Sequence, residues 1–215
     1  KAADVLLSTF HALGREILLD NHEKLGLSDQ FIVLDEDDKR FVINHISGES
    51  HAAAALSEKL SKAKRELLSP KPENSDFDAL FDRYQRYLRH ADCVDLDDLI
   101  YLPAKLLESD AEVLQSFRQR FPWLMVDEYQ DTNFAQYKLV QALTAPQNNL
   151  FAVGDPDQSI YAFRGADYRN VLRLERDYPD HHTILLEQNY RSTQNILDAA
   201  MAVINHNPNR TPRHL

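Results

Sequence analysis

Three short apolar runs alternate with helical patterns in the C-terminal half of the chain and constrain its fold more than any other feature. They cover residues 123–126, 150–153 and 183–186. Runs of this length, separated by amphipathic helical segments, are typical of buried strands in a parallel α/β sheet. The sequence therefore predicts an α/β fold with strands at these three positions.

A polar cluster follows each apolar run at the point where the predicted strand ends. Asp127 and Glu128 follow the first, Gly154 and Asp155 follow the second, and residues 187–191 follow the third. Ligands of open α/β sheets bind at the carboxyl ends of the strands, so we expect one shared site. Two adjacent carboxylates can divide the work of holding Mg²⁺ and activating a water. The alternative interpretation is a pair of solvated acids in a loop.

Residues 21–107 have a different sequence pattern, which predicts an almost entirely helical region. Apolar side chains recur at helical spacing from Phe77 to Ala91, after a possible cap at Asn74 or Ser75. In this pattern Tyr84 and Tyr87 are predicted to be core residues. Near the start of the chain, we predict a short strand at 5–7, a helix that starts near Phe10, and a helix end at Gly26.

Composition limits the classes of function. The net charge of −10 argues against a domain whose only role is to bind the phosphate backbone of nucleic acids. A nucleic-acid function must therefore rest on local sequence features. No apolar run has the length of a membrane span, and no secretory signal is visible. Cys93 is the only cysteine, which fits a reducing compartment. We therefore expect a cytoplasmic protein with no membrane contact.

Five segments, in order along the chain, resemble motifs of superfamily-one DNA helicases of the Rep/UvrD/PcrA type. Residues 126–133 (VDEYQDTN) are similar to the Walker B segment, and residues 153–165 to the third motif. Residues 186–193 (LEQNYRST) are similar to the fourth. Upstream, residues 8–11 (STFH) are similar to a DNA-contact motif, and residues 94–99 (VDLDDL) to the acidic motif that closes a helical insertion. The resemblance covers nearly the whole chain and is closest to the Rep-like branch.

The resemblance implies an ATP site that uses Mg²⁺. By analogy Asp127 coordinates the metal, and Glu128 is the catalytic base. Gln158 senses the γ-phosphate and couples hydrolysis to DNA. Arg191 contacts the same phosphate and stabilises developing charge, and Tyr190 stacks on the adenine.

The resemblance also implies single-stranded DNA and single/double-strand junctions as partners. Tyr161 and Phe163 would offer flat surfaces to unstacked bases, and Arg164 would contact phosphate or base. Thr9 and His11 would contact the backbone of the single strand. The family usually has tryptophan at the position of Phe163, which leaves a smaller stacking face here.

A basic stretch adds a second hypothesis for DNA contact. It consists of Lys59, Lys62, Lys64, Arg65 and Lys71. On a helix of the insertion these side chains would contact duplex DNA ahead of the motor. A solvated helix face is an equally good interpretation of the same residues.

The resemblance further implies a division of the chain. Residues 1–20 and 108–180 would belong to a partial RecA-like P-loop NTPase motor domain with a parallel sheet. Residues 21–107 would be an all-helical insertion, and residues 181–215 would begin a second motor domain. The implied function is part of an ATP-dependent 3′→5′ DNA helicase that moves along single strands and unwinds duplexes. Two alternatives stay open: the motor subunit of a helicase-nuclease, and a catalytically inert DNA-binding fragment.

The phosphate-binding loop of such motors is missing from these 215 residues. The pattern glycine, four residues, glycine, lysine, serine or threonine does not occur, and none of the five glycines precedes a lysine. In the family this loop lies before the STFH motif, so we interpret the chain as a fragment of a longer motor.

We predict that this chain by itself binds ATP weakly or not at all and does not hydrolyse it. The measurement is phosphate release by the purified chain, with and without single-stranded DNA. Hydrolysis above background would contradict the prediction. Anisotropy of a labelled single strand completes the test, because DNA binding that ignores ATP would favour the inert-fragment alternative.

Overall fold

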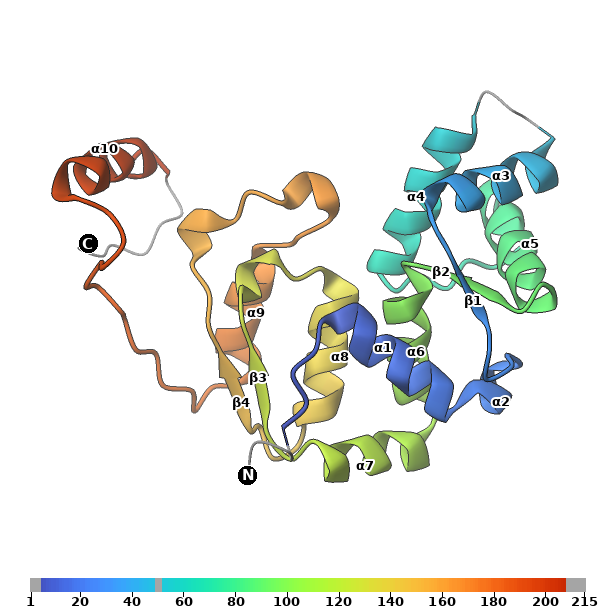
Figure 1. Ribbon diagram of the computed structural model, residues 1–215, viewed down its shortest axis with the longest axis horizontal. Helices are drawn as coiled ribbons and strands as arrows, with labels where there is room; N and C mark the ends of the chain where they lie inside the picture. The colour runs from blue at the N-terminus through green and yellow to red at the C-terminus, as the bar shows by residue number, and fades with distance from the viewer. Residues whose placement is uncertain (1–4, 49–51, 208–215) are drawn as a thin grey trace. The chain divides into compact units, whose positions relative to one another are not determined.

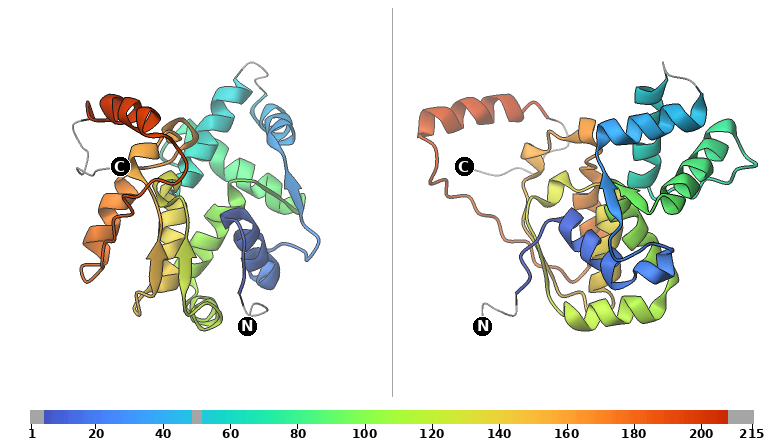
Figure 2. Two further views of the ribbon diagram at one scale, coloured as in Figure 1. Left: turned by 60° about the vertical axis from the view of Figure 1, so that its left-hand side comes forward. Right: turned by 45° about the vertical axis from the view of Figure 1, so that its right-hand side comes forward.

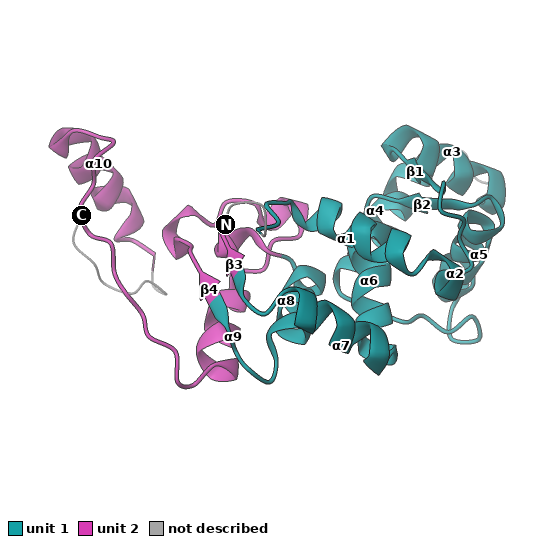
Figure 3. Cartoon of the chain, turned by 60° about the horizontal axis from the view of Figure 1, so that its bottom comes forward, with its two compact units in different colours: residues 1–124, 133–150 teal, residues 125–132, 151–215 magenta. Residues whose placement is uncertain are grey.

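The computed structural model describes residues 5–48 and 52–207. The chain divides into two compact units, drawn in different colours in Figure 3. The first unit comprises residues 1–124 and 133–150, and the second comprises residues 125–132 and 151–215. None of the helices in the described ranges has the length and apolar character that crossing a bilayer requires.

The described residues form a mostly helical structure with two small parallel sheets (Figure 1). The α-helices are α1 (Phe10–Asp20), α2 (His22–Leu25), α3 (Glu36–Ser47), α4 (Ala53–Arg65), α5 (Asp76–His90), α6 (Asp98–Ser109), α7 (Ala111–Arg120), α8 (Phe134–Thr144), α9 (Arg169–Asp177) and α10 (Gln194–Ile204). The strands are β1 (Ile32–Leu34), β2 (Cys93–Asp95), β3 (Leu124–Val126) and β4 (Leu150–Ala152). Three short 3₁₀ turns are η2 (Tyr129–Asp131), η3 (Pro156–Gln158) and η4 (Ala162–Arg164).

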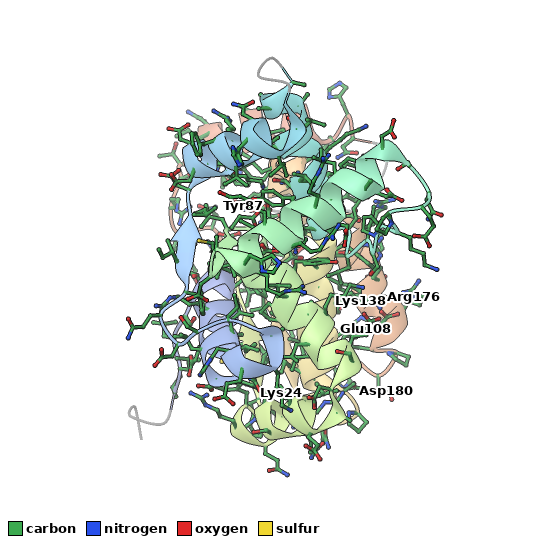
Figure 4. All side chains as sticks on the ribbon, turned by 90° about the vertical axis from the view of Figure 1, so that its right-hand side faces the viewer. Lys24, Tyr87, Glu108, Lys138, Arg176 and Asp180 are labelled. Carbon is green, nitrogen blue, oxygen red and sulfur yellow. The ribbon has the colours of Figure 1, made fainter. Side chains whose placement is uncertain are left out.

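Helices α3, α4, α5 and α6 enclose one apolar core of the first unit (Figure 2). The predicted periodicity of α5 is confirmed, with Tyr84 fully buried in this core. Tyr87, labelled in Figure 4, packs against the core, and its ring lies 5.9 Å from that of His45 on α3. Both tyrosines are core residues, as the pattern predicted.

A second core joins α1, α6, α7 and α8. Ile17 and Leu139 are fully buried there. Gly14 lets α1 approach α6 closely, because a Cβ at that position would lie 1.6 Å from the carbonyl oxygen of Leu99. No side chain fits in that space, so packing of α1 on α6 requires glycine here.

The prediction that residues 21–107 are all-helical is wrong in one respect. Strands β1 and β2 pair in parallel, with Ile32 opposite Cys93 and Leu34 opposite Asp95. Each strand is three residues long, which is too short to show a periodicity of two. Their pairing joins segments about 60 residues apart, so a local sequence pattern cannot reveal it.

Helix ends agree with the predicted signals. Ser75, not Asn74, caps α5: its side chain accepts a hydrogen bond from the amide of Asp78. Gly26 ends α2 in the left-handed conformation with φ 68°.

The strand predicted at 5–7 is wrong, because Val5 and Leu7 are 73% and 97% exposed and lie outside regular structure.

Strands β3 and β4 confirm two of the three predicted strands and their parallel direction. The Leu124 amide donates to the carbonyl of Asn149 at 2.9 Å, and the Val153 amide donates to that of Val126 at 2.8 Å. Residue numbers rise together on both strands, as parallel pairing requires.

The third predicted strand is wrong: residues 183–186 have no regular structure, and Ile184 and Leu186 are 78% and 82% exposed. An apolar run becomes a strand only when another strand satisfies its backbone groups, and none of the described strands pairs with this one.

Two fully buried lysines lie among carboxylates between α3, α4 and β2. Lys64 Nζ lies 2.7 Å from Asp95 Oδ2 and 2.8 Å from Asp98 Oδ1. Lys39 Nζ lies 2.8 Å from Asp97 Oδ2, and its side chain is 1% exposed. The acidic motif thus supplies the counter-charges for two lysines inside the helical core.

The electrostatics of this network follow from burial and from the neighbouring charges. Burial alone would lower the pKa of Lys64, but the charges of Asp95 and Asp98 outweigh it and raise that pKa. Burial opposes ionisation of Asp95, yet Lys64 and Lys39 hold its pKa well below the usual range. For Asp98, burial and the charge of Asp95 raise the pKa to about 6. Asp95 is therefore the carboxylate that the lysines hold ionised.

We predict that Lys64→Met destabilises the chain by about 3 kcal/mol, because it leaves buried carboxylates without their cation. Urea unfolding measures the change in the free energy of unfolding. Lys62→Met is the matched control on the same helix. The Lys62 side chain is 68% exposed and its Nζ lies 4.0 Å from Glu66 Oε1, so loss of this charge should cost less than about 1 kcal/mol. Equal effects of the two substitutions would contradict the prediction.

Candidate functional site

The acid pair lies directly beyond the end of β3, in the second unit. Asp127 and Glu128 are both exposed, and Asp127 Oδ1 accepts a hydrogen bond of 2.9 Å from the Glu128 amide. Glu128 has a left-handed backbone with φ 49° and ψ 44°, which costs a non-glycine residue about 1 kcal/mol or more. The Tyr129 amide then donates to the Val153 carbonyl at 2.9 Å, so β4 holds the strained turn in place.

Gln130 joins the acid pair to the end of β4. Its Nε2 donates to Glu128 Oε2 at 2.7 Å, and its Oε1 accepts from the Asp155 amide at 2.9 Å. The residue is 1% exposed, so water does not compete for these bonds. Sequence reasoning assigned Gln130 no role, although the residue lies inside the Walker B-like motif.

Asp155 continues the path to Gln158. Asp155 Oδ1 accepts from the Asp157 amide at 2.9 Å, and Oδ2 accepts from Gln158 Nε2 at 2.7 Å. This arrangement caps the short turn η3, which Pro156 begins. The hydrogen bonds therefore run from Glu128 through Gln130 and Asp155 to Gln158. The structure thus links Glu128 to Gln158, and the nucleotide site that they are expected to share stays a prediction.

Gly154 leaves room for Gln130 in this arrangement. A Cβ on Gly154 would lie 2.7 Å from Gln130 Oε1 and 3.3 Å from the Tyr129 nitrogen. The first distance is shorter than any ordinary contact, so a larger residue would displace the Gln130 amide or the strand end. Glycine after β4 thus serves close approach of the two strand ends.

Negative charge gathers around Glu128. Burial and the charge of Glu128 raise the pKa of Asp131, which lies three residues along the chain. One oxygen of Asp131, Oδ1, is buried without a hydrogen-bond partner. Such a concentration of carboxylates suits a site that binds a cation.

The donor set fits a magnesium ion that arrives with phosphate. Among the described residues no group of three or more histidine, cysteine or acidic side chains forms a cage for a metal. Magnesium is usually bound through one or two carboxylates together with waters and phosphate oxygens, not by protein alone. The exposed carboxylate of Asp127 meets that requirement.

An exposed aromatic group lies at the start of η4, farther along the second unit. The rings of Tyr161 and Phe163 are 6.1 Å apart, and Phe163 is 75% exposed. The Arg164 guanidinium lies 5.4 Å from the first ring centroid and 5.5 Å from the second. Two flat faces and a cation in solvent are the features that bind unstacked bases.

The same segment, 130–132, anchors the loop of η3 and η4 at both ends. Gln130 holds the amide of Asp155, as described above. The carbonyl of Thr132 accepts from the amide of Asp167 at 3.0 Å and from Asn170 Nδ2 at 2.8 Å. Thr132 and Asn170 are buried, so the loop between 155 and 167 is tied to the turn that carries the acid pair.

The remaining predicted site residues are not joined to this network by the hydrogen bonds above. Thr9 and His11 are exposed in the first unit, and the Thr9 hydroxyl caps α1 by accepting from the Ala12 amide at 3.2 Å. Tyr190 is 93% exposed, and the Arg191 amide donates to Asn189 Oδ1 at 2.9 Å within the same irregular segment. The expected convergence of three strand ends thus holds for two.

The basic stretch at 59–71 does not form one solvated face. Lys64 is buried in the ion network, so it is unavailable to DNA in this fold. Arg65 is paired with Glu58 at 2.6 Å, and Lys59 Nζ lies 5.2 Å from the ring centroid of Phe77. The hypothesis of a duplex contact is therefore wrong for Lys64.

Comparison with known proteins gives consistent matches. A family model described as the UvrD/REP helicase N-terminal domain matches residues 1–179. The chain is 43% identical over 228 residues to the ATP-dependent DNA helicase PcrA of Leuconostoc citreum, covering 100% of this chain and 30% of that protein. It is 40% identical to the protein of the same name from Staphylococcus epidermidis and 39% identical to that of Staphylococcus aureus, with 31% of each covered. The chain thus spans less than a third of these relatives.

Proposed function

The chain belongs to the UvrD/REP helicase family, and we propose that it is part of an ATP-driven DNA helicase. The observation that carries the proposal is the hydrogen-bonded path from Glu128 through Gln130 and Asp155 to Gln158. It joins one acid of a pair that suits nucleotide hydrolysis to an amide that suits phosphate sensing. The relatives reported above are PcrA proteins, so special closeness to Rep stays a prediction.

We propose the following division of the chain. Residues 1–20 and 108–180 contribute to a RecA-like motor domain, residues 21–107 are its insertion, and residues 181–215 begin a second motor domain. Residues 1–4, 49–51 and 208–215 of these ranges lie outside the described residues. Support comes from the parallel β3–β4 pair and from the insertion's own core between α3 and α6.

ATP is the substrate in this proposal, and Mg²⁺ bound at Asp127 would neutralise the phosphates. Glu128 accepts the proton of the attacking water, and its hydrogen bond to Gln130 fixes the carboxylate that does so. Gln158 contacts the γ-phosphate through a side chain that carries no fixed charge. Arg191 stabilises charge on the same phosphate, and Tyr190 stacks on the adenine.

Single-stranded DNA is the proposed track. Tyr161 and Phe163 stack on bases whatever their identity, as a motor that moves along any sequence requires. Arg164, Thr9 and His11 contact the strand. The loop that carries η4 is anchored to the turn of the acid pair, so nucleotide and DNA can influence each other over a short path. Translocation with 3′→5′ polarity and opening of duplex junctions complete the proposal.

We predict that Glu128→Gln in the full-length protein lowers the kcat of ATP hydrolysis by about 100-fold or more, because the general base is lost. Nucleotide binding should be retained, since the amide keeps the size of the side chain. Steady-state phosphate release and equilibrium binding of a fluorescent ATP analogue measure the two effects. Hydrolysis at the parental rate would show that Glu128 is not the base.

We predict that Arg164→Ala weakens binding of single-stranded DNA by about 10-fold and reduces stimulation of the ATPase by DNA. Anisotropy of a labelled oligonucleotide and the ratio of kcat with and without DNA measure the effects. Arg176→Ala is the matched control, because Arg176 is a surface arginine of the same unit that pairs with Asp177 at 2.7 Å. A loss of DNA binding that is equal in both variants would argue against a specific role for Arg164.

A further inference from the structure

We propose that Gln130 is a positioning residue that holds the Glu128 carboxylate in a fixed place relative to the Asp155–Gln158 turn. The inference rests on the proposed function, because it gives Glu128 the role of base and Gln158 that of phosphate sensor. Gln130 itself touches neither nucleotide nor DNA in this proposal. It acts through the two residues that its amide joins.

The side-chain chemistry of Gln130 matches this task. Its Nε2 donates to a carboxylate while its Oε1 accepts from a backbone amide, with distances of 2.7 Å and 2.9 Å. A primary amide donates from one end and accepts at the other without carrying charge. An ionised glutamate at the same position would only accept, and methionine would have neither capacity.

The hydrogen bonds of Gln130 to Glu128 and Asp155, called the bridge below, are buried. Gln130 is 1% exposed, so water cannot take over its bonds to Glu128 and Asp155 when the side chain is replaced. Gly154 leaves space at Oε1, where a Cβ would lie 2.7 Å away. The two residues therefore form one fitted contact between the strand ends.

The bridge also connects the base to the DNA-facing loop. Asp155 receives the Gln130 bond through its backbone and the Gln158 bond through its side chain. Any shift of Gln158 toward a phosphate changes the hydrogen bonding of Asp155, and Gln130 transmits that change to Glu128. The same loop continues through Tyr161 into η4, which carries Phe163, so DNA binding can bias the position of the base by the same route.

The test compares three variants of the full-length protein with the parent: Gln130→Met, Gln130→Glu and the control Gln136→Met. Gln136 is an amide six residues away whose Oε1 caps α8 by accepting from the Asn133 amide at 2.9 Å, and it has no bond to Glu128. We measure kcat and KM for ATP with and without single-stranded DNA, and the melting temperature of each variant.

We expect Gln130→Met to lower the DNA-stimulated kcat by about 100-fold while the KM for ATP changes by less than about threefold, because the base is misplaced but the nucleotide still binds. Gln130→Glu should be no more active, since its charge repels Glu128. Gln136→Met should keep the parental kcat even if it lowers the melting temperature. Parental kcat in Gln130→Met would overturn the proposal, as would an equal loss of kcat in Gln136→Met.

A second variant keeps the test decisive if Gln130→Met does not fold. Gly154→Ala retains the amide but pushes on Oε1, and we expect the same loss of kcat with little change in KM. Parental kcat in Gly154→Ala would then overturn the proposal. If the parent itself shows no DNA-stimulated ATPase, the proposed function fails and the inference falls with it; an active parent with active variants overturns the inference alone.

Discussion

The buried amide of Gln130 is the interaction on which the candidate site depends. In the turn after β3, Glu128 has a left-handed backbone conformation. The turn after β4 contains the 3₁₀ element η3, which Asp155 caps. Two hydrogen bonds from one buried side chain join them, in surroundings where an unmade bond is costly. The strain at Glu128 persists because β4 and Gln130 hold that turn from both sides.

A comparable principle organises the first unit. There the acidic motif around Asp95 and Asp98 turns inward and pairs with Lys64 inside the helical core. Replacing such a network by apolar groups can be neutral, but removing one partner is costly. Buried polar groups of this kind specify one arrangement of α3, α4 and β2 among the many that apolar packing alone would allow.

The position of the aromatic loop gives the site its functional interest. The loop between 155 and 167 is anchored at both ends to residues 130–132, which follow the acid pair directly. A ligand on Tyr161, Phe163 or Arg164 is therefore a few hydrogen bonds from Glu128. A contiguous hydrogen-bonded element with more than one arrangement can carry coupling between two sites. In the proposed motor, this short connection couples the nucleotide bound at the acid pair to the affinity of the aromatic loop for DNA.

The sequence by itself determined α1 and α5, two of the strands and the place of the acid pair at the end of the first of these strands, because those features leave local patterns of spacing, capping and apolar runs. It also placed the chain in its family through motifs that follow one another in order. Tertiary structure decided the rest. Pairing of β1 with β2, burial of Lys64, and failure of 183–186 to form a strand depend on partners distant in the sequence. The bridging role of Gln130 exists only where β3 and β4 lie side by side, since a side-chain amide joins two turns only after folding has brought both within hydrogen-bond reach.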